Sequence, residues 1–186
     1  MNLPNKLTVF RILLIPVFML IVIFGGDASV KVAGTTVYWK LVIAAIVFAV
    51  ASATDWFDGH IARSRNLVTN FGKFADPLAD KMLTMTAFIM LISLNLAPDW
   101  VIAIIVCREL AVTGLRLILA ENKGQVMAAA MPGKIKTTFQ MLSIIFLLIG
   151  DFHHIGTILL YIALIFTIYS GWDYFRSSWD VFEGSM

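Results

Sequence analysis

Four aspartates lie within residues 55–80 of a chain that is otherwise mostly apolar. Asp55 and Asp58 are three residues apart, and Asp76 and Asp80 are four apart. On helices these spacings place each pair on one face, so two helices could present all four carboxylates to a common point. Clustered carboxylates repel one another where water is scarce, and two divalent cations would neutralise them. Because every ligand atom would be an oxygen, the pattern favours Mg²⁺, Mn²⁺ or Ca²⁺ over zinc.

Cations held by carboxylates suit phosphate chemistry. They shield a diphosphate, polarise the phosphorus centre and stabilise the leaving oxygen. The small residues Gly59, Ala62 and Gly72 flank the aspartates and allow a ligand or a neighbouring helix to come close. Helix-end caps or solvated charges would explain any one aspartate, but carboxylates beside apolar spans are costly and usually functional. The sequence therefore predicts a substrate that is a diphosphate with a lipid tail.

The rest of the chain must position these residues. Of its 186 residues, 60% are hydrophobic and 14% charged, and the mean hydropathy is +0.87, whereas an ordinary soluble domain has about 25% charged residues. We expect an all-α integral membrane protein with six transmembrane helices, centred on residues 12–24, 41–54, 82–97, 100–115, 137–150 and 155–172. Several apolar runs are shorter than the roughly 20 residues that cross a bilayer, so charged turns must complete them. With no visible linker or repeat, residues 1–186 are predicted to form one membrane domain.

The basic residues predict how these helices are oriented. If the N-terminus is cytoplasmic, the outer segments near 25–40, 95–99 and 150–156 contain only Lys31 and Lys40 of the 14 Lys and Arg residues. This positive-inside bias predicts that both termini and the aspartates are cytoplasmic. The first apolar run lacks a convincing cleavage site, so we expect it to be retained as a span. A net charge of +2 is too small to predict nucleic-acid binding.

The aspartates belong to a longer pattern that resembles a known family. The CDP-alcohol phosphatidyltransferases have a signature that this chain matches without a departure, as Asp55-x₂-Asp58-Gly59-x₂-Ala62-Arg63-x₈-Gly72-x₃-Asp76-x₃-Asp80. The resemblance implies a six-helix membrane enzyme, usually a homodimer, that uses an alcohol to displace CMP from a CDP-linked lipid such as CDP-diacylglycerol. It also implies two divalent ions, Mg²⁺ or Mn²⁺.

The resemblance assigns roles to single residues. Asp55, Asp58 and Asp76 are expected to be metal ligands, and Asp80 both a ligand and the general base on the attacking hydroxyl. A positioned carboxylate can activate a primary alcohol, but a bound metal lowers the basicity of Asp80, and the alternative is that it mainly places the hydroxyl. Arg11 is explained equally well by contact with the nucleotide or by anchoring at the membrane interface. The residues expected to hold the CDP-lipid are Asn5, Thr8, Gly59, Ala62, Arg63 and Thr69.

Other segments bear on which alcohol attacks. MNLPNKLTVFR, REL-x-VTGLR (x is Ala111) and PGKIKT most resemble bacterial members of the family whose acceptor is glycerol 3-phosphate. That resemblance implies phosphatidylglycerophosphate as the product and the bacterial cytoplasmic (inner) membrane as the location. Glu109 either orients an arginine or neutralises charge. The candidates for binding the acceptor phosphate are Arg108, Arg116, Lys134 and Lys136, although positive-inside anchoring and anionic membrane lipids would account for one or two of them.

Other functions are compatible with parts of the pattern. Within the family, the acceptor could instead be inositol phosphate, serine or phosphatidylglycerol. A cation channel or transporter could cluster carboxylates at membrane depth, but it does not require the glycine, alanine and arginine of the signature, and no inverted repeat is visible. An intramembrane prenyltransferase would be compatible with Asp76-x₃-Asp80 alone, but six spans are too few for that family. Metal-dependent release of CMP from CDP-diacylglycerol would separate these functions.

Overall fold

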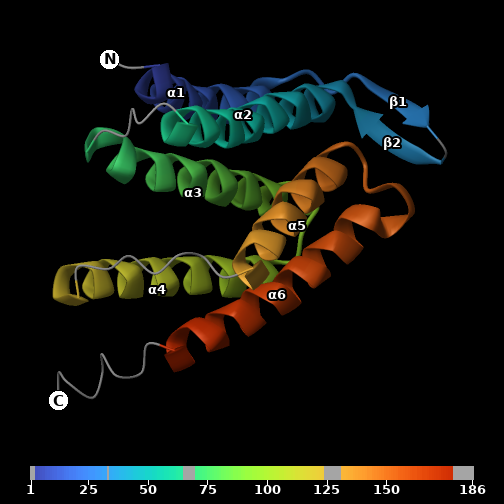
Figure 1. Cartoon of the computed structure of the whole chain (residues 1–186). Helices are drawn as coiled ribbons and strands as arrows, with labels where there is room; N and C mark the ends of the chain where they lie inside the picture. Colours follow the sequence, from blue (N-terminus) through green and yellow to red (C-terminus); the bar gives the residue numbers. More distant parts are fainter. Residues whose placement is uncertain (1–2, 33, 65–69, 124–130, 178–186) are drawn as a thin grey trace.

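The computed structural model describes the backbone of residues 3–32, 34–64, 70–123 and 131–177, and the side chains of residues 6–32, 34–54, 78–116, 131 and 133–177. Six α-helices dominate this part of the chain, with a β-hairpin after the first and a 3₁₀ turn before the last (Figure 1). Their bounds are α1 Leu3–Phe24, β1 Ser29–Val32, β2 Thr35–Tyr38, α2 Trp39–Ser64, α3 Asn70–Ser93, α4 Asp99–Lys123, α5 Met131–Leu148, η1 Phe152–His154 and α6 Ile155–Ser177.

The helices extend beyond the apolar runs of the sequence, as the short runs require. α2 continues past Thr54 through the first aspartate pair, and α3 begins twelve residues before Met82 and contains the second pair. Both pairs therefore lie on helices, which was the premise for placing each pair on one face. Even α5, with 18 residues, has a length of about 27 Å at 1.5 Å per residue, close to the ~30 Å hydrocarbon core of a bilayer.

Large apolar side chains point outward from all six helices. The side chains of Leu13, Phe24, Ile165 and Trp172 are between 60% and 77% exposed, for example. Surface of this kind is stable against lipid and unfavourable against water. Among the described residues, two helical stretches, Lys6–Phe24 and Phe152–Ser177, are long and apolar enough by themselves to cross a membrane. These observations support a helical membrane protein, while six spans with cytoplasmic termini remain a prediction.

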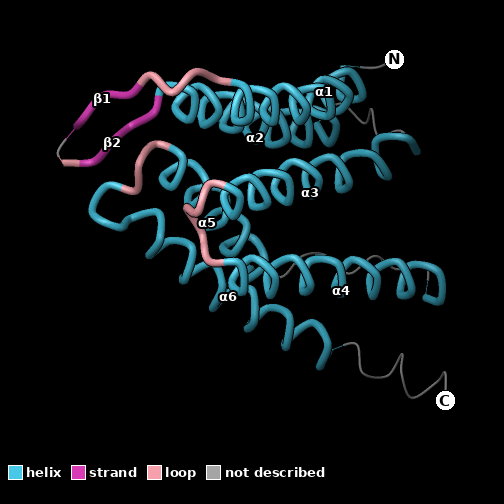
Figure 2. The backbone as a smooth tube through the Cα atoms, turned by 180° about the vertical axis from the view of Figure 1, so that it is seen from behind, coloured by secondary structure: helices cyan, strands magenta, loops and turns pink. Residues whose placement is uncertain are grey.

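Helix α5 joins the other helices into one core. α1 contacts α2 and α3, α4 contacts α6, and α5 crosses between them and contacts α2, α3 and α6 (Figures 1 and 2). The ring centroids of Phe18 on α1 and Phe48 on α2 are 6.2 Å apart. A single apolar cluster includes buried side chains from every helix, among them Phe18, Phe48, Phe88, Ile105, Ile144 and Leu160. This core fixes the positions of α3, α4, α5 and α6, which carry the polar site described below.

The β-hairpin is a departure from the all-α expectation. β1 and β2 pair antiparallel, with Val30 opposite Val37, and Gly34 in the connecting turn has a positive φ of 83°. Val37 is buried, and a Cβ added to Gly150 would lie 3.3 Å from a methyl group of Val37, so the hairpin rests on the α5–α6 connection. β-branched residues on both sides of a glycine turn favour this structure. The prediction of an outer loop for residues 25–40 did not take this signal into account.

The described connections between helices lie at one end of the molecule. The hairpin, the α3–α4 turn and the α5–α6 turn lie at one end, which we call the hairpin end, whereas α1 begins and α6 ends at the other (Figure 1). The three segments predicted to lie outside the membrane, near residues 25–40, 95–99 and 150–156, thus share one end. Their common location agrees with one membrane face, and which face this is remains a prediction.

Candidate active site

The predicted metal and nucleotide residues are only partly described. Asp80 on α3 and Thr8 on α1 are the members of these sets whose side chains can be placed. The side chains of Asn5, Asp55, Asp58, Gly59, Ala62, Arg63 and Asp76 lie outside the described ones, and Thr69 lies outside the described residues. What is established is that the two aspartate pairs lie on α2 and α3, and that these helices contact each other. The roles of these residues therefore stay predictions.

Asp80 lies three turns into α3, where the helix passes from its polar end to its apolar part. Its side chain is partly buried and its Oδ1 atom is buried. The hydroxyl of Thr84 donates to the backbone carbonyl of Asp80 at 3.0 Å. A buried carboxylate oxygen is a hard donor of the kind that Mg²⁺ and Mn²⁺ prefer, so Asp80 fits both of its predicted roles.

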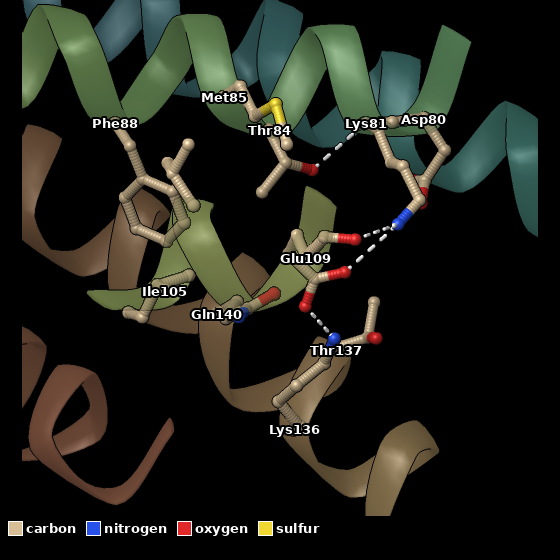
Figure 3. Close-up of a pocket in the computed structure, with 11 residues that line it drawn as sticks. Asp80, Lys81, Thr84, Met85, Phe88, Ile105, Glu109, Lys136, Thr137 and Gln140 are labelled. Carbon is tan, nitrogen blue, oxygen red and sulfur yellow. Dashed lines mark hydrogen bonds and ion pairs between the residues drawn. The ribbon is translucent and has the colours of Figure 1, made fainter. Parts of the chain in front are cut away.

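Glu109 on α4 is the centre of a charged cluster that joins three helices. Its Oε2 atom lies 3.1 Å from Nζ of Lys81 on α3, and its Oε1 atom is paired with Nζ of Lys136 on α5. Nη1 of Arg108 is 3.4 Å from the same Oε1 atom. Figure 3 shows the two lysines approaching Glu109 from α3 and α5. Of the two sequence-based explanations of Glu109, the structure supports both, since it contacts an arginine and neutralises cations.

The charged side chains around Glu109 are largely shielded from solvent. The exposed fraction of the side chain is 6% for Lys136, 13% for Arg108 and 15% for Glu109. Burying an ion is costly unless an opposite charge and hydrogen bonds compensate it, and removing one member leaves the others uncompensated. The cluster therefore fixes the relative positions of α3, α4 and α5, and the cations cannot simply turn away into water.

Two arginines of α4 are held by α6. Nη2 of Arg108 donates to Oγ of Ser170 at 2.9 Å. The guanidinium carbon of Arg116 lies 5.2 Å from the ring centroid of Tyr174, which is cation–π geometry. Among the residues that the structure describes, the buried Nε atoms of both arginines have no hydrogen-bond partner. Buried N–H groups are nearly always paired, and the described residues leave these two unpaired.

The charged side chains surround a pocket of about 180 Å³, which we call the cationic pocket. Among the described residues, four cations and two carboxylates line it, which leaves an excess of two positive charges. The exposed side chain of Lys134 is not part of the lining. A smaller neighbouring cavity shares Asp80 and Glu109 with it (Figure 3). The lining residues are Asp80, Lys81, Arg108, Glu109, Val112, Arg116, Gly133, Lys136 and Thr137.

The structure thus brings some predicted residues together and adds others. Asp80, Arg108, Arg116 and Lys136 share one pocket although the sequence separates the first and last by 56 residues. Lys81 was overlooked, although a lysine directly after the last aspartate of the signature is a visible signal. Ser170 and Tyr174 were overlooked as well, because a serine and a tyrosine near the end of an apolar helix are typical of any membrane span.

Arg11 is buried, so anchoring at the membrane interface does not describe it. Its side chain has no exposed surface, and Nε donates at 3.2 Å to the carbonyl of Ala51 on α2, one helical turn before Asp55. Thr8, one turn earlier on α1, is fully buried too. Thr8 and Arg11 therefore pack inward, and Arg11 contacts the helix that carries the first aspartate pair.

Comparison with known proteins identifies the class to which this fold and site belong. Residues 1–169 match the family described as CDP-alcohol phosphatidyltransferase, and the chain belongs to that family, which confirms the resemblance found in the signature. The chain is 46% identical to the CDP-diacylglycerol–glycerol-3-phosphate 3-phosphatidyltransferase of Bacillus subtilis (strain 168), over 99% of this chain and 98% of the relative. Proteins of the same name from Rickettsia typhi and Yersinia enterocolitica are 38% and 36% identical, over at least 95% of each chain.

Proposed function

We propose that this protein transfers the phosphatidyl group of CDP-diacylglycerol to the hydroxyl of sn-glycerol 3-phosphate, forming phosphatidylglycerophosphate and CMP. The observation that carries the proposal is the cationic pocket, in which two carboxylates, Asp80 and Glu109, and four cations leave an excess of two positive charges among the described lining residues. A phosphate monoester has a charge of about −1.5 to −2 at neutral pH. The relatives named above have this activity in their names.

The pocket suits both ends of the acceptor. Arg108 and Arg116 have planar guanidinium groups that match phosphate oxygens, and Lys136 adds a point charge. Asp80, in the same lining, would take the proton of the attacking hydroxyl or place that hydroxyl. Lys134 is exposed and outside the lining, so we expect Lys134→Ala to raise the acceptor KM less than Lys136→Ala does.

The residues proposed to bind the donor, CDP-diacylglycerol, come mainly from the aspartate signature. Asp55, Asp58, Asp76 and Asp80 would hold two divalent ions, Mg²⁺ or Mn²⁺, which when bound neutralise the diphosphate of the CDP-lipid. The supporting observations are the location of both aspartate pairs on contacting helices and the buried oxygen of Asp80. The CDP group would be held by Asn5, Thr8, Gly59, Ala62, Arg63 and Thr69. The proposed setting is a homodimer in the bacterial cytoplasmic membrane, with the site facing the cytoplasm.

The test is an acceptor comparison on the purified enzyme. CDP-diacylglycerol is supplied with Mg²⁺ and with glycerol 3-phosphate, glycerol, serine or inositol in parallel, and release of CMP is measured. Of the four acceptors, we expect only glycerol 3-phosphate to be turned over. Glycerol offers the same hydroxyl but lacks the phosphate that the cations would bind. Arg176→Ala, which removes an exposed arginine of α6 outside the pocket, should behave like the parent enzyme. Preference for an uncharged acceptor would overturn the glycerol 3-phosphate assignment but leave the family unchanged.

A further inference from the structure

Helix α6 contacts Arg108 through two consecutive small residues. Ser170 accepts a hydrogen bond from Nη2 of Arg108, and Gly171 lies directly beneath the stem of the same side chain. Both residues are buried. Neither is charged, and neither lines the cationic pocket. Their contact with the pocket is therefore made through Arg108.

The hydroxyl oxygen of Ser170 can only accept a hydrogen bond from Arg108. A serine hydroxyl has one hydrogen to donate and two lone pairs that accept. That hydrogen points back into α6, where the carbonyl oxygen of Phe166 is 2.6 Å from Oγ. The oxygen can then only accept from Nη2 of Arg108. A charged donor paired with such an acceptor forms one of the stronger kinds of hydrogen bond.

Gly171 provides the space in which Arg108 lies. A Cβ atom at this position would be 3.1 Å from Cγ and 3.2 Å from Nε of Arg108. Contacts this short require the arginine to move by some tenths of an ångström. The absence of a side chain at Gly171 therefore lets the stem of Arg108 lie against α6 while its end remains in the lining of the pocket.

We propose that Ser170 and Gly171 are positioning residues that orient Arg108 toward the phosphate of the acceptor. The guanidinium group is held at Nη1 by Glu109 and at Nη2 by Ser170. The remaining N–H groups of Nη1 and Nη2 are then presented to a ligand in a fixed geometry. Fixing a binding group before the ligand arrives lowers the entropy cost of binding. This inference rests on the proposed function, because it takes the phosphate to be the ligand of Arg108.

The experiment measures the KM values for glycerol 3-phosphate and CDP-diacylglycerol, each at saturation of the other substrate, in detergent-solubilised full-length enzyme. Ser170→Ala should raise the acceptor KM about 2- to 10-fold, the size expected for one lost hydrogen bond, and leave the CDP-diacylglycerol KM unchanged. Ser170→Thr keeps the hydroxyl and should retain the parent value. Ser143→Ala is the matched control, because Ser143 is buried and its hydroxyl bonds only the carbonyl of Gln140 in its own helix.

Gly171→Ala tests the same idea without removing a polar group. Alanine is the better helix former, so α6 should not be weakened, whereas the displaced arginine should raise the acceptor KM several-fold. Thermal unfolding in detergent shows whether Ser170→Ala folds. If it does not, Gly171→Ala tests the inference in its place.

A double-mutant cycle separates this inference from the function on which it rests. If Ser170 acts through Arg108, Ser170→Ala should have no further effect on the acceptor KM in an Arg108→Ala background. An acceptor KM that rises in Arg108→Ala but not in Ser170→Ala and Gly171→Ala would overturn the positioning role and leave the proposed function intact. The positioning role would also be overturned if Ser170→Ala raised the acceptor KM by the same factor in the parent enzyme and in the Arg108→Ala background. An unchanged acceptor KM in Arg108→Ala would refute the phosphate contact itself, and with it the role of α6.

Discussion

Charged side chains are used differently at the hairpin end and in the cationic pocket. At the hairpin end, Asp27, Lys40 and Asp151 have local partners: Nζ of Lys40 lies 2.6 Å from Oδ1 of Asp27, whose side chain is 82% exposed. The two carboxylate oxygens of Asp151 accept from the backbone N–H and the hydroxyl of Thr157 at 3.1 and 2.6 Å. These contacts connect the loop between α1 and β1 to α2 and cap the start of α6. They serve the turns in which they occur.

The charges of the described side chains that line the cationic pocket do not balance. Glu109 alone is shared by Lys81, Arg108 and Lys136, and Arg116 contacts an aromatic ring. The side chains are mostly buried, so water offers little compensation. We infer that charge with local partners serves the fold, whereas buried charge in excess indicates the place of an anionic ligand. The predictions below test that distinction.

Removal of divalent ions should have the largest effect. We expect excess EDTA to abolish turnover and added Mg²⁺ or Mn²⁺ to restore it, because the diphosphate of the CDP-lipid would be bound through the ions. Release of CMP from CDP-diacylglycerol measures this. The helix content by circular dichroism should stay the same, since the described helices pack through an apolar core. Undiminished turnover in EDTA would refute the metal site.

Asp80→Asn should have the next largest effect. Asparagine keeps the size and one oxygen but cannot take a proton, so the rate should fall about 10²- to 10⁴-fold while binding of the CDP-lipid survives far better. Single-turnover kinetics and equilibrium binding of CDP-diacylglycerol separate the two quantities. Asp99→Asn is the matched control, because Asp99 is exposed at the hairpin end and accepts from the N–H of Trp100. A parallel loss of binding and rate would make Asp80 mainly a metal ligand.

Arg108→Ala and Arg116→Ala should mainly raise the KM for glycerol 3-phosphate. A lost hydrogen bond to a charged group costs roughly 1.5–3 kcal/mol, which is about 10- to 150-fold in kcat/KM. Arg108→Lys should recover only part of the loss, since lysine keeps the charge without the planar fork. Steady-state kinetics at saturating CDP-diacylglycerol measure the effect, with Arg176→Ala as the control. Wild-type acceptor KM values in both alanine variants would remove the arginines from the acceptor site.

The sequence predicts the helices well and the packing between them poorly. Six mostly apolar runs and the charged turns that complete them identify the six described helices, because these runs contrast clearly with the polar segments between them. The periodicity of α1 does not show which flank is inward, because lipid-facing and core-facing side chains are equally apolar. The sequence explains Arg11 equally well by nucleotide contact or by interface anchoring, and only the packing shows that it is buried. The alternating pattern of the short strands on either side of Gly34 is weak, and the helical patterns before and after it are much stronger.

The same contrast holds for the site. The signature locates Asp80 without any structure, since its spacing is specific. Four cations near helix ends are also visible in the sequence, but only the packing of α4 and α5 shows that Lys136 enters the pocket and Lys134 does not. Gly171 has no chemical group of its own, and its contact with Arg108 depends on how α6 crosses α4. Residues that act through shape or through another residue leave little trace in a single sequence.

The smallest effect on activity is expected at the hairpin end. Asp151→Ala removes the acceptor of two hydrogen bonds from Thr157 at the start of α6, and the loss of such a cap costs about 1 kcal/mol of stability. The KM values for both substrates should stay at their parent values, because Asp151 belongs to the end of the molecule away from the cationic pocket. Thermal unfolding in detergent measures the stability, and the kinetics described above measure the KM values. Asp173→Ala, which removes an exposed aspartate near the other end of α6, controls for the loss of one negative charge. A changed acceptor KM in Asp151→Ala would mean that the hairpin end and the pocket are coupled, and the distinction between charges that serve the fold and charges that bind the substrate would then fail.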